Sequence, residues 1–171
     1  MATAQLKQTE VDLYRGTLLR YLGYANELGE SFRAFIGSRM VKATYVVALG
    51  YGLADAVDKS RKQLAISQQH GDSIRKQRFE CANGFVQTLY WQSLASVFIP
   101  GMIINRVVAT SGWAMNRLSQ NPVARKWVPT AVGLAIIPVI IHPIDTFVDK
   151  SMQYIPEPAA RWVEETVLKE Q

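Results

Sequence analysis

Residues 85–105 read FVQTLYWQSLASVFIPGMIIN, and this stretch decides the fold class. It belongs to a run from 81 to 105 in which 25 successive residues carry no charge, and a second run, from 127 to 144, has 18. A transmembrane helix needs roughly 20 predominantly apolar residues. We therefore predict that residues 84–105 and 127–144 are membrane-spanning helices.

Two shorter apolar runs lie on either side of the first predicted span. Residues 43–54 read ATYVVALGYGLA, and extension to Val57 with a snorkelling Lys42 makes 43–57 a short span. A buried helix or a re-entrant segment is the alternative. Residues 107–115, VVATSGWAM, are too few to cross a bilayer core of about 30 Å at about 1.5 Å per residue. We predict an interfacial or re-entrant helix at 107–117.

Residues 11–36 have the pattern of an amphipathic helix. Apolar side chains recur at steps of three and four, and the stripe includes Tyr14, Leu18, Tyr21, Leu28 and Phe32. Such a stripe fits a helix that packs on its own domain, or one that lies on the membrane surface or on a partner. We predict contact with lipid or a partner protein. A shorter amphipathic helix is predicted in the tail, 156–171.

Residues 58–83 are the most polar internal segment. They are rich in charge and glutamine, and His70-Gly71-Asp72 has the composition of a turn. We predict a polar loop that connects two spans through solvent, with a patch for lipid head groups as the alternative. The predicted fold class is thus an all-α polytopic membrane protein: about three transmembrane helices in one membrane domain, 1–171, with an N-terminal amphipathic helix and a short interfacial helix.

The basic residues favour lipid over nucleic acid as a partner. The net charge is +5, but no basic stripe is interleaved with stacking aromatics, so no nucleic-acid partner is predicted. Cations beside apolar spans attract anionic head groups. We predict that five residues at the span ends contact an anionic lipid such as cardiolipin: Arg39, Lys42, Arg106, Arg125 and Lys126.

The residue types that catalysis and metal binding require are scarce. The two histidines, His70 and His142, are far apart in sequence, and the one cysteine is Cys81. The usual nucleotide-binding and hydrolase motifs are absent. Asp55 and Asp58 are one turn apart, and we interpret them as a helix end beside basic residues, not as a catalytic pair. We predict no enzyme activity, no catalytic residue, no cofactor and no metal.

Four blocks of sequence resemble the mitochondrial fission process protein family. They are DLYRGTLLRYLGYANELGESFR (12–33), YGLADAVDKSRK (51–62), WQSLASVFIPGMIINRV (91–107) and VARKWVPTAVGLAIIPVIIHPID (123–145). The resemblance implies an integral, multi-pass protein of the inner mitochondrial membrane without catalytic activity. It also implies a link to mitochondrial division and to inner-membrane integrity.

The resemblance leaves the mechanism open. A division factor would act through its amphipathic helix and its lipid contacts, in the organisation of the inner membrane. An accessory structural subunit of a respiratory complex, a supercomplex or ATP synthase would instead bury its N-terminal helix and tail on partner proteins. A small transporter, which we favour least, would need polar groups around a cavity between broken helices. The expected partners are membrane lipid, cardiolipin first, and other inner-membrane proteins.

Overall fold

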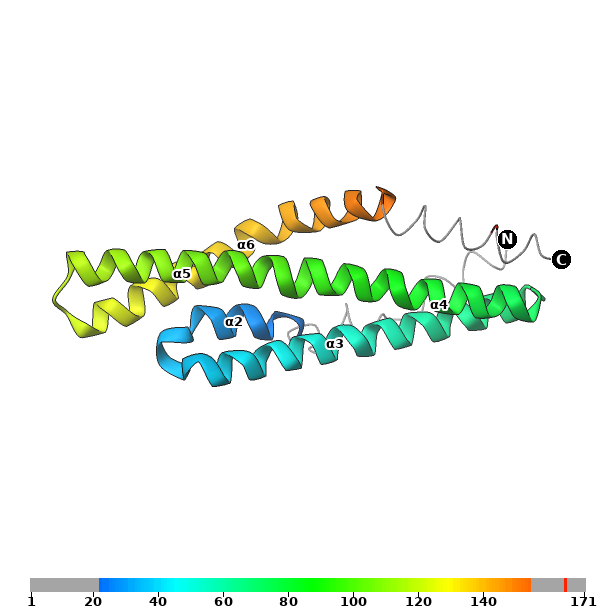
Figure 1. The fold of residues 1–171 in the computed structure, drawn as a ribbon, viewed down its shortest axis with the longest axis horizontal. Coiled ribbons are helices and arrows are strands. Elements are labelled where there is room, and N and C mark those ends of the chain that lie inside the picture. Colours follow the sequence, from blue (N-terminus) through cyan, green and yellow to red (C-terminus); the bar gives the residue numbers. More distant parts are fainter. Residues whose placement is uncertain (1–21, 155–164, 166–171) are drawn as a thin grey trace.

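Long helices that run back and forth make up the protein (Figure 1). The computed structural model describes residues 22–154 and Glu165. Its helices are α2 (Ala25–Ser31), α3 (Arg33–Gln69), α4 (Ile74–Trp91), η3 (Gln92–Phe98), α5 (Ile99–Leu118) and α6 (Pro122–Tyr154). Every regular element in the described residues is helical, which confirms the predicted all-α class.

Three of these stretches are long and apolar enough to cross a membrane. α4, η3 and α5 join end to end into one rod of 45 residues, from Ile74 to Leu118. At about 1.5 Å per residue this rod is about 68 Å long, more than twice the hydrocarbon core of a bilayer at about 30 Å. α3, with 37 residues, and α6, with 33, also meet the length and composition of a span. The expected three long apolar helices are therefore present.

The prediction of a polar loop at 58–83 is wrong. α3 continues to Gln69 and α4 begins at Ile74, so only 70–73 connect them. The turn itself falls where it was predicted: Gly71 has φ 72° and donates its N–H to Gln68 O at 3.1 Å. This segment is rich in lysine, arginine, glutamine and glutamate, which are all good helix formers. Their abundance indicates contact with solvent, and it is compatible with a helix. Ion pairs one helical turn apart support α3: Lys59–Asp55 and Lys62–Asp58. Lys76 at the start of α4 pairs with Asp72 of the connecting turn.

The predicted separate helix at 107–117 is also corrected, because these residues continue α5 as far as Leu118. Pro100 does not end the helix, which widens upstream of the proline instead. Over Gln92–Phe98 it is a π-helix, and the Ile99 N–H bonds to Leu94 O, five residues back. Proline lacks an N–H and its ring crowds the carbonyl four residues earlier. The wider turn before Pro100 accommodates both effects without ending the rod.

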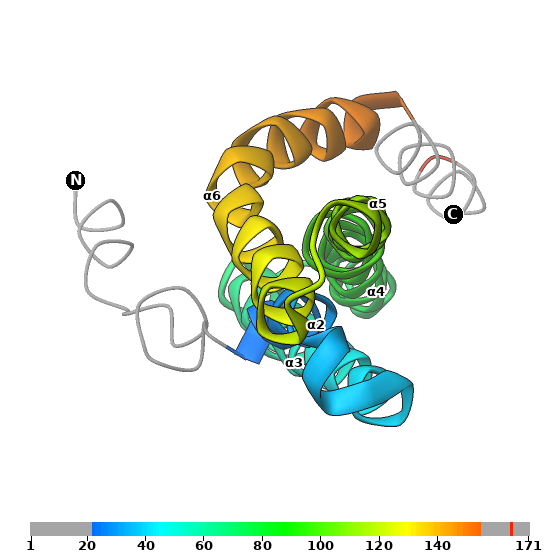
Figure 2. The ribbon, with the colours of Figure 1, turned by 90° about the vertical axis from the view of Figure 1, so that its left-hand side faces the viewer.

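The last span belongs to a helix that runs well beyond the predicted end at residue 144. α6 continues to Tyr154, and Figure 2 shows it curving past the rod that contains α4 and α5. Three prolines lie inside it: Pro129, Pro138 and Pro143. Proline bends a helix more often than it ends one when neighbouring helices enclose the freed carbonyls. The predicted tail helix, 156–171, lies outside the described residues apart from Glu165.

The predicted helix 11–36 is two helices in its described part. α2 ends at Ser31, α3 begins at Arg33, and Gly37 has φ 73°, a backbone conformation that glycine adopts without strain. The chain reverses there, and α2 lies antiparallel against α3 (Figure 1). The apolar side chains keep their spacing of three and four through this reversal. The periodicity of the sequence therefore predicted one helix where the structure has two.

The interior of this helix bundle contains polar as well as apolar side chains, and many large apolar side chains face outward. Val46 is 70% exposed, Met102 61% and Val139 62%. The buried polar side chains are Asn26, Glu27, Glu30, Ser31, Asp55, Ser60, Ser67, Gln92 and Thr130. A bundle in water buries its apolar faces. In lipid, polar side chains face neighbouring helices, where they find hydrogen-bond partners. The packing is that of a bundle whose surface meets hydrocarbon.

Candidate functional site: a polar interior between the helices

α2 contributes the polar face at the centre of the bundle. Asn26, Glu27 and Glu30 are buried against the neighbouring helices, whereas Leu28 is 45% exposed. The predicted contact stripe therefore points away from the bundle at Leu28, and Phe32 is half-buried. Contact of these two residues with lipid or a partner stays a prediction. The other members of the stripe, Tyr14, Leu18 and Tyr21, lie outside the described residues.

Glu30 joins three helices through its carboxylate. Arg33 donates from Nε at 2.7 Å and from Nη2 at 2.6 Å, a bidentate ion pair. Tyr45 of α3 donates its hydroxyl at 3.0 Å, and Asn105 of α5 donates its amide at 2.9 Å. Each of these bonds is charge-assisted, the stronger kind of hydrogen bond. A buried charge is tolerated when it is paired and hydrogen-bonded in this way, so Glu30 is a structural junction.

A second polar network surrounds Asp55, in the middle of α3. Its Oδ2 accepts from Lys59 Nζ at 3.0 Å and from Gln92 Nε2 at 2.5 Å, and Gln92 Oε1 accepts from Ser96 at 2.8 Å. Lys59 lies beside Asp55 as expected, but the interpretation of Asp55 as part of a helix end is wrong. Asp55 lies well inside α3, is fully buried, and accepts a hydrogen bond from Gln92 of η3. The network fixes the start of the π-helix against α3.

The π-helix is also tied to α2. Asn26 donates its side-chain amide to Val97 O at 3.1 Å, across 71 residues of sequence. A π-helix shifts backbone carbonyls out of the regular ladder and often occurs at functional sites. Here an asparagine from a different helix satisfies one such carbonyl. Sequence reasoning missed this contact because asparagine within an amphipathic helix usually faces solvent.

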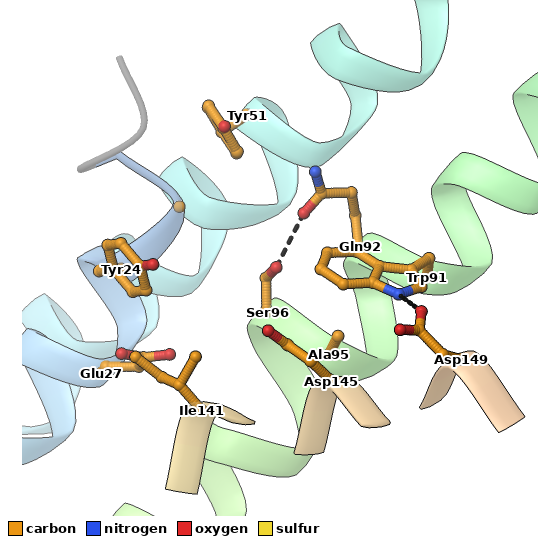
Figure 3. A pocket seen from close by; sticks show the side chains of 11 residues that line it. Tyr24, Glu27, Tyr51, Trp91, Gln92, Ala95, Ser96, Ile141, Asp145 and Asp149 are labelled. Atoms are coloured by element: carbon orange, nitrogen blue, oxygen red, sulfur yellow. Dashed lines mark hydrogen bonds between the residues drawn. The ribbon is translucent and has the colours of Figure 1, made fainter. Parts of the chain in front are cut away.

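A cavity of about 420 Å³ lies beside these networks, between α2, α3, η3 and α6 (Figure 3). Its wall contains the carboxyl groups of Glu27, Asp145 and Asp149. Trp91 Nε1 donates to Asp149 Oδ1 at 2.7 Å, which joins α4 to α6. Sequence reasoning placed no site here. A signal was available in the acidic residues of otherwise apolar segments, because ionisable groups at membrane depth are costly and usually functional.

Four of the predicted lipid-binding cations lie near helix starts: Arg39 and Lys42 in α3, and Arg125 and Lys126 in α6. Arg106 lies within α5. The rings of Phe35 and Trp127 lie 4.9 Å apart between centroids and bring these two helix starts together. Arg39, Lys42, Arg106 and Lys126 are exposed. Arg125 differs from the other four.

Arg125 closes the turn between α5 and α6. Its guanidinium donates from Nε to Ser119 O at 2.7 Å and from Nη2 to Asn116 O at 3.3 Å. The side chain therefore has a structural role that the sequence did not indicate. Nearby, the Arg117 guanidinium lies 4.4 Å from the centroid of the Trp113 ring. Lipid contact by the predicted cations stays a prediction.

Nothing in residues 22–154 resembles a metal centre: no three histidine, cysteine or acidic side chains there are grouped closely enough to hold an ion. The interior of the described bundle contains polar side chains whose hydrogen bonds connect the helices. Together with the outward-facing apolar side chains and the three long helices, this defines the class as an α-helical membrane protein.

Within that class the chain belongs to the mitochondrial 18 kDa protein family (MTP18), whose sequence profile matches residues 13–152. A relative from Homo sapiens, named Mitochondrial fission process protein 1, is 48% identical over 151 residues, 87% of this chain and 88% of the relative. Relatives of the same name from Danio rerio and Caenorhabditis elegans are 47% and 45% identical, covering 86% and 82% of this chain and 87% and 84% of their own lengths. The resemblance seen in four sequence blocks is confirmed. No solved structure matches the chain.

Proposed function

We propose that this chain acts in mitochondrial fission as a non-enzymatic, multi-pass protein of the inner mitochondrial membrane. The name that its relatives carry supports the process. The observation that carries the membrane topology is the outward orientation of large apolar side chains on three long helices. With three crossings, the turn at 70–73 and the end of α6 lie on one side of the membrane, and the turn at 119–121 on the other.

The surfaces of the bundle are the parts through which such a protein would organise the inner membrane. The exposed side of α2 carries Leu28. The exposed Lys126 precedes Trp127 in the sequence, and the Trp127 ring contacts Phe35. Cations beside interfacial tryptophan favour anionic lipid, and each cation near a charged surface contributes about 1 kcal/mol. Cardiolipin bound beside Trp127 would link the bundle to the surrounding bilayer.

The location is tested by extraction and protease access. Alkaline carbonate should leave the protein in the membrane pellet of isolated mitochondria. Protease should not reach epitope tags on either terminus in intact mitochondria, and it should cut at least one of them in mitoplasts. Recovery in the carbonate supernatant would contradict the spans, and cleavage in intact mitochondria would contradict the inner membrane.

The process is tested by depletion and rescue. Loss of the protein should lengthen the mitochondrial network by reducing fission, and the wild-type chain should restore fragmentation. A tagged inner-membrane protein of similar length, expressed at the same level, is the control for overexpression. A network that is unchanged by depletion would contradict the proposed role.

An accessory structural subunit of a respiratory complex, a supercomplex or ATP synthase is the second candidate. The feature that favours it is the charged half of the α3–α4 hairpin, where residues 58–83 extend the helices beyond their most apolar parts. A stiff, charged hairpin can serve as a docking surface for another protein. Native separation of mild-detergent extracts distinguishes the candidates, because a subunit should migrate with a megadalton assembly and a free fission factor should not.

A further inference from the structure

His142 of α6 is an ionisable side chain on the outer surface of a span. The apolar run 127–144 contains the polar side chains of Thr130 and His142. Thr130 is buried and donates its hydroxyl to the backbone of its own helix at 3.0 Å, whereas His142 is exposed. The Thr146 hydroxyl donates to the backbone carbonyl of His142 at 2.9 Å, and not to its imidazole. His142 therefore differs from the polar side chains of the interior, which bond between helices.

Two tryptophans of the long rod indicate the depth of His142 in the membrane. Trp91 and Trp113 are 22 residues apart. At about 1.5 Å per residue they are about 33 Å apart, close to the hydrocarbon thickness of about 30 Å, and tryptophan is enriched at both interfaces of a membrane. Trp91 donates to Asp149 of α6 at 2.7 Å, so these two residues lie at one level. His142 precedes Asp149 by seven residues. It therefore lies about 10 Å inside that interface.

An imidazole at this depth needs a polar partner. Lysine and arginine can extend a charged head to the interface along a flexible stem. The imidazole of His142 is attached directly to Cβ and cannot reach so far. Ionisable side chains within membrane spans almost always face protein or a water-filled cavity, because hydrocarbon offers them no hydrogen bond. The outer face of α6 at His142 is therefore a surface for contact with protein.

The surface around His142 suits the close approach of another helix. Ala131 and Ala135 are exposed, and they precede His142 at steps of four and seven residues, which places all three on one side of α6. Small residues let the backbones of two membrane helices approach closely. α6 lies at the edge of the bundle (Figure 2), and 17% of its most apolar window is buried, against 28% and 33% in the other two spans. Among the spans it has the most surface left for contact with protein.

We propose that two copies of this chain pair through this face of α6, with the imidazole of His142 in one copy hydrogen-bonded to the imidazole of His142 in the other. Copies of one chain insert in the same orientation, so a two-fold axis along the membrane normal brings equivalent residues together at equal depth. A neutral imidazole has one N–H donor and one nitrogen acceptor, and two of them therefore satisfy one another. A different protein would have to carry its own polar group at that depth. The proposal rests on the membrane crossing of α6 proposed above, and it does not depend on a role in fission.

The test measures dimerisation of the full chain in phosphatidylcholine liposomes. Copies that carry a donor or an acceptor fluorophore on Cys81, the one cysteine of the sequence, are diluted with lipid, and energy transfer gives the dissociation constant. His142→Leu should weaken pairing about threefold to fifteenfold, the range for one hydrogen bond between membrane helices. Thr146→Val is the matched control on the same helix. The Thr146 hydroxyl already bonds to its own backbone, so this variant should pair like the wild type.

Disulfide formation between copies tests which face is in contact. In a Cys81→Ser background, Ala135→Cys should form a disulfide-linked dimer under mild oxidation, because Ala135 lies on the proposed face. Val46→Cys is the control, since Val46 is 70% exposed but belongs to α3. Equal yields of dimer from the two variants would overturn the assignment to α6.

Mixed dimers distinguish a symmetric pair from other contacts of His142. A bond between two imidazoles needs both, so wild type mixed with His142→Leu should pair as weakly as His142→Leu with itself. Intermediate affinity would show that His142 bonds to a different residue of the second copy, and would overturn the proposal. Equal affinity of the wild type and His142→Leu would also overturn it, as would a wild type that stays monomeric. A monomer that resists carbonate extraction would overturn the pairing alone and leave the membrane crossings intact.

Discussion

The contact between α2 and α3 at Gly29 makes a quantitative prediction. A Cβ atom added to Gly29 would lie 2.9 Å from Cβ of Thr44, whereas carbon atoms in contact normally stay about 3.5–4.0 Å apart. Thr44 Cβ is attached to the backbone, so the clash cannot be relieved by a rotamer change. Thr44 Oγ1 also donates to Val41 O at 2.7 Å, which holds the side chain in place. The two helices must therefore separate.

The matched control is Gly50, which is also helical but has no atom within 4 Å of the added Cβ. Replacing glycine by alanine within a helix stabilises it by about 1 kcal/mol, and this gain is common to both variants. The difference between Gly29→Ala and Gly50→Ala is therefore the overpacking cost alone, about 1–3 kcal/mol. For a chain of this size each kcal/mol shifts the Tm by about 2–4 °C.

The assay is thermal unfolding of the full chain in mild detergent, followed by tryptophan fluorescence. Gly29→Ala should unfold about 2–12 °C below Gly50→Ala, from the costs above. In a Thr44→Gly background the penalty of Gly29→Ala should disappear. A Gly29→Ala protein that is as stable as Gly50→Ala would refute the close packing of α2 on α3.

Three further predictions concern the polar contacts. Glu30→Gln should lower the free energy of unfolding by about 1–3 kcal/mol, because an amide cannot accept from all three donor side chains; an unchanged Tm would contradict the junction. Arg125→Gln should lower the Tm by releasing the α5–α6 turn, whereas Lys126→Gln should leave the Tm unchanged and reduce the cardiolipin that co-purifies, measured by lipid mass spectrometry. Hydrogen bonds from Ser67 and Lys76 hold the pKa of Asp72 below its ordinary value of 3.8, so its contribution to stability is present at neutral pH and lost as the pH falls below that value. Asp72→Asn should therefore lower the hydrogen-exchange protection of residues 66–77 at pH 7. It should also remove the loss of protection that the wild type shows in acid, once the exchange rates are corrected for the intrinsic effect of pH.

The spans could be predicted from the sequence because the decisive quantity is local. A run of 25 residues without a charge identifies a bilayer-crossing segment whatever its neighbours are. The helix ends could not be predicted in the same way. Residues 58–69 and 74–83 are charged in both a solvated loop and a solvated helix. The i,i+4 ion pair between Lys62 and Asp58 is the kind of contact that a helix brings together.

The polar site was missed for a different reason. The sequence argument followed the apolar side of the helix, for which it predicted contact with lipid or a partner, and assigned no role to the polar side. In water the apolar side of a helix faces the protein. α2 has the opposite orientation, with Glu27 and Glu30 inward and Leu28 outward. In lipid the apolar side meets a solvent as apolar as itself, so the sign of the argument changes. The periodicity of the sequence located the apolar face of the helix, but it could not show whether that face meets water or lipid.

The outward orientation of the apolar side chains also affects which interactions hold the bundle together. Hydrocarbon solvent removes most of the hydrophobic driving force between helices, so close packing and polar bonds must supply it. Both occur at the same crossings. Gly101 lies where Tyr45 crosses α5, and Tyr45 donates to Glu30; Gly52 lies against Gln92, which donates to Asp55. The small residue lets the backbones approach, and the polar pair fixes the register at that separation. Glu30 and Asp55 each accept hydrogen bonds from at least two side chains, and in each case one of the donors belongs to another helix. These two carboxylates are therefore the points at which polar bonds hold the bundle together.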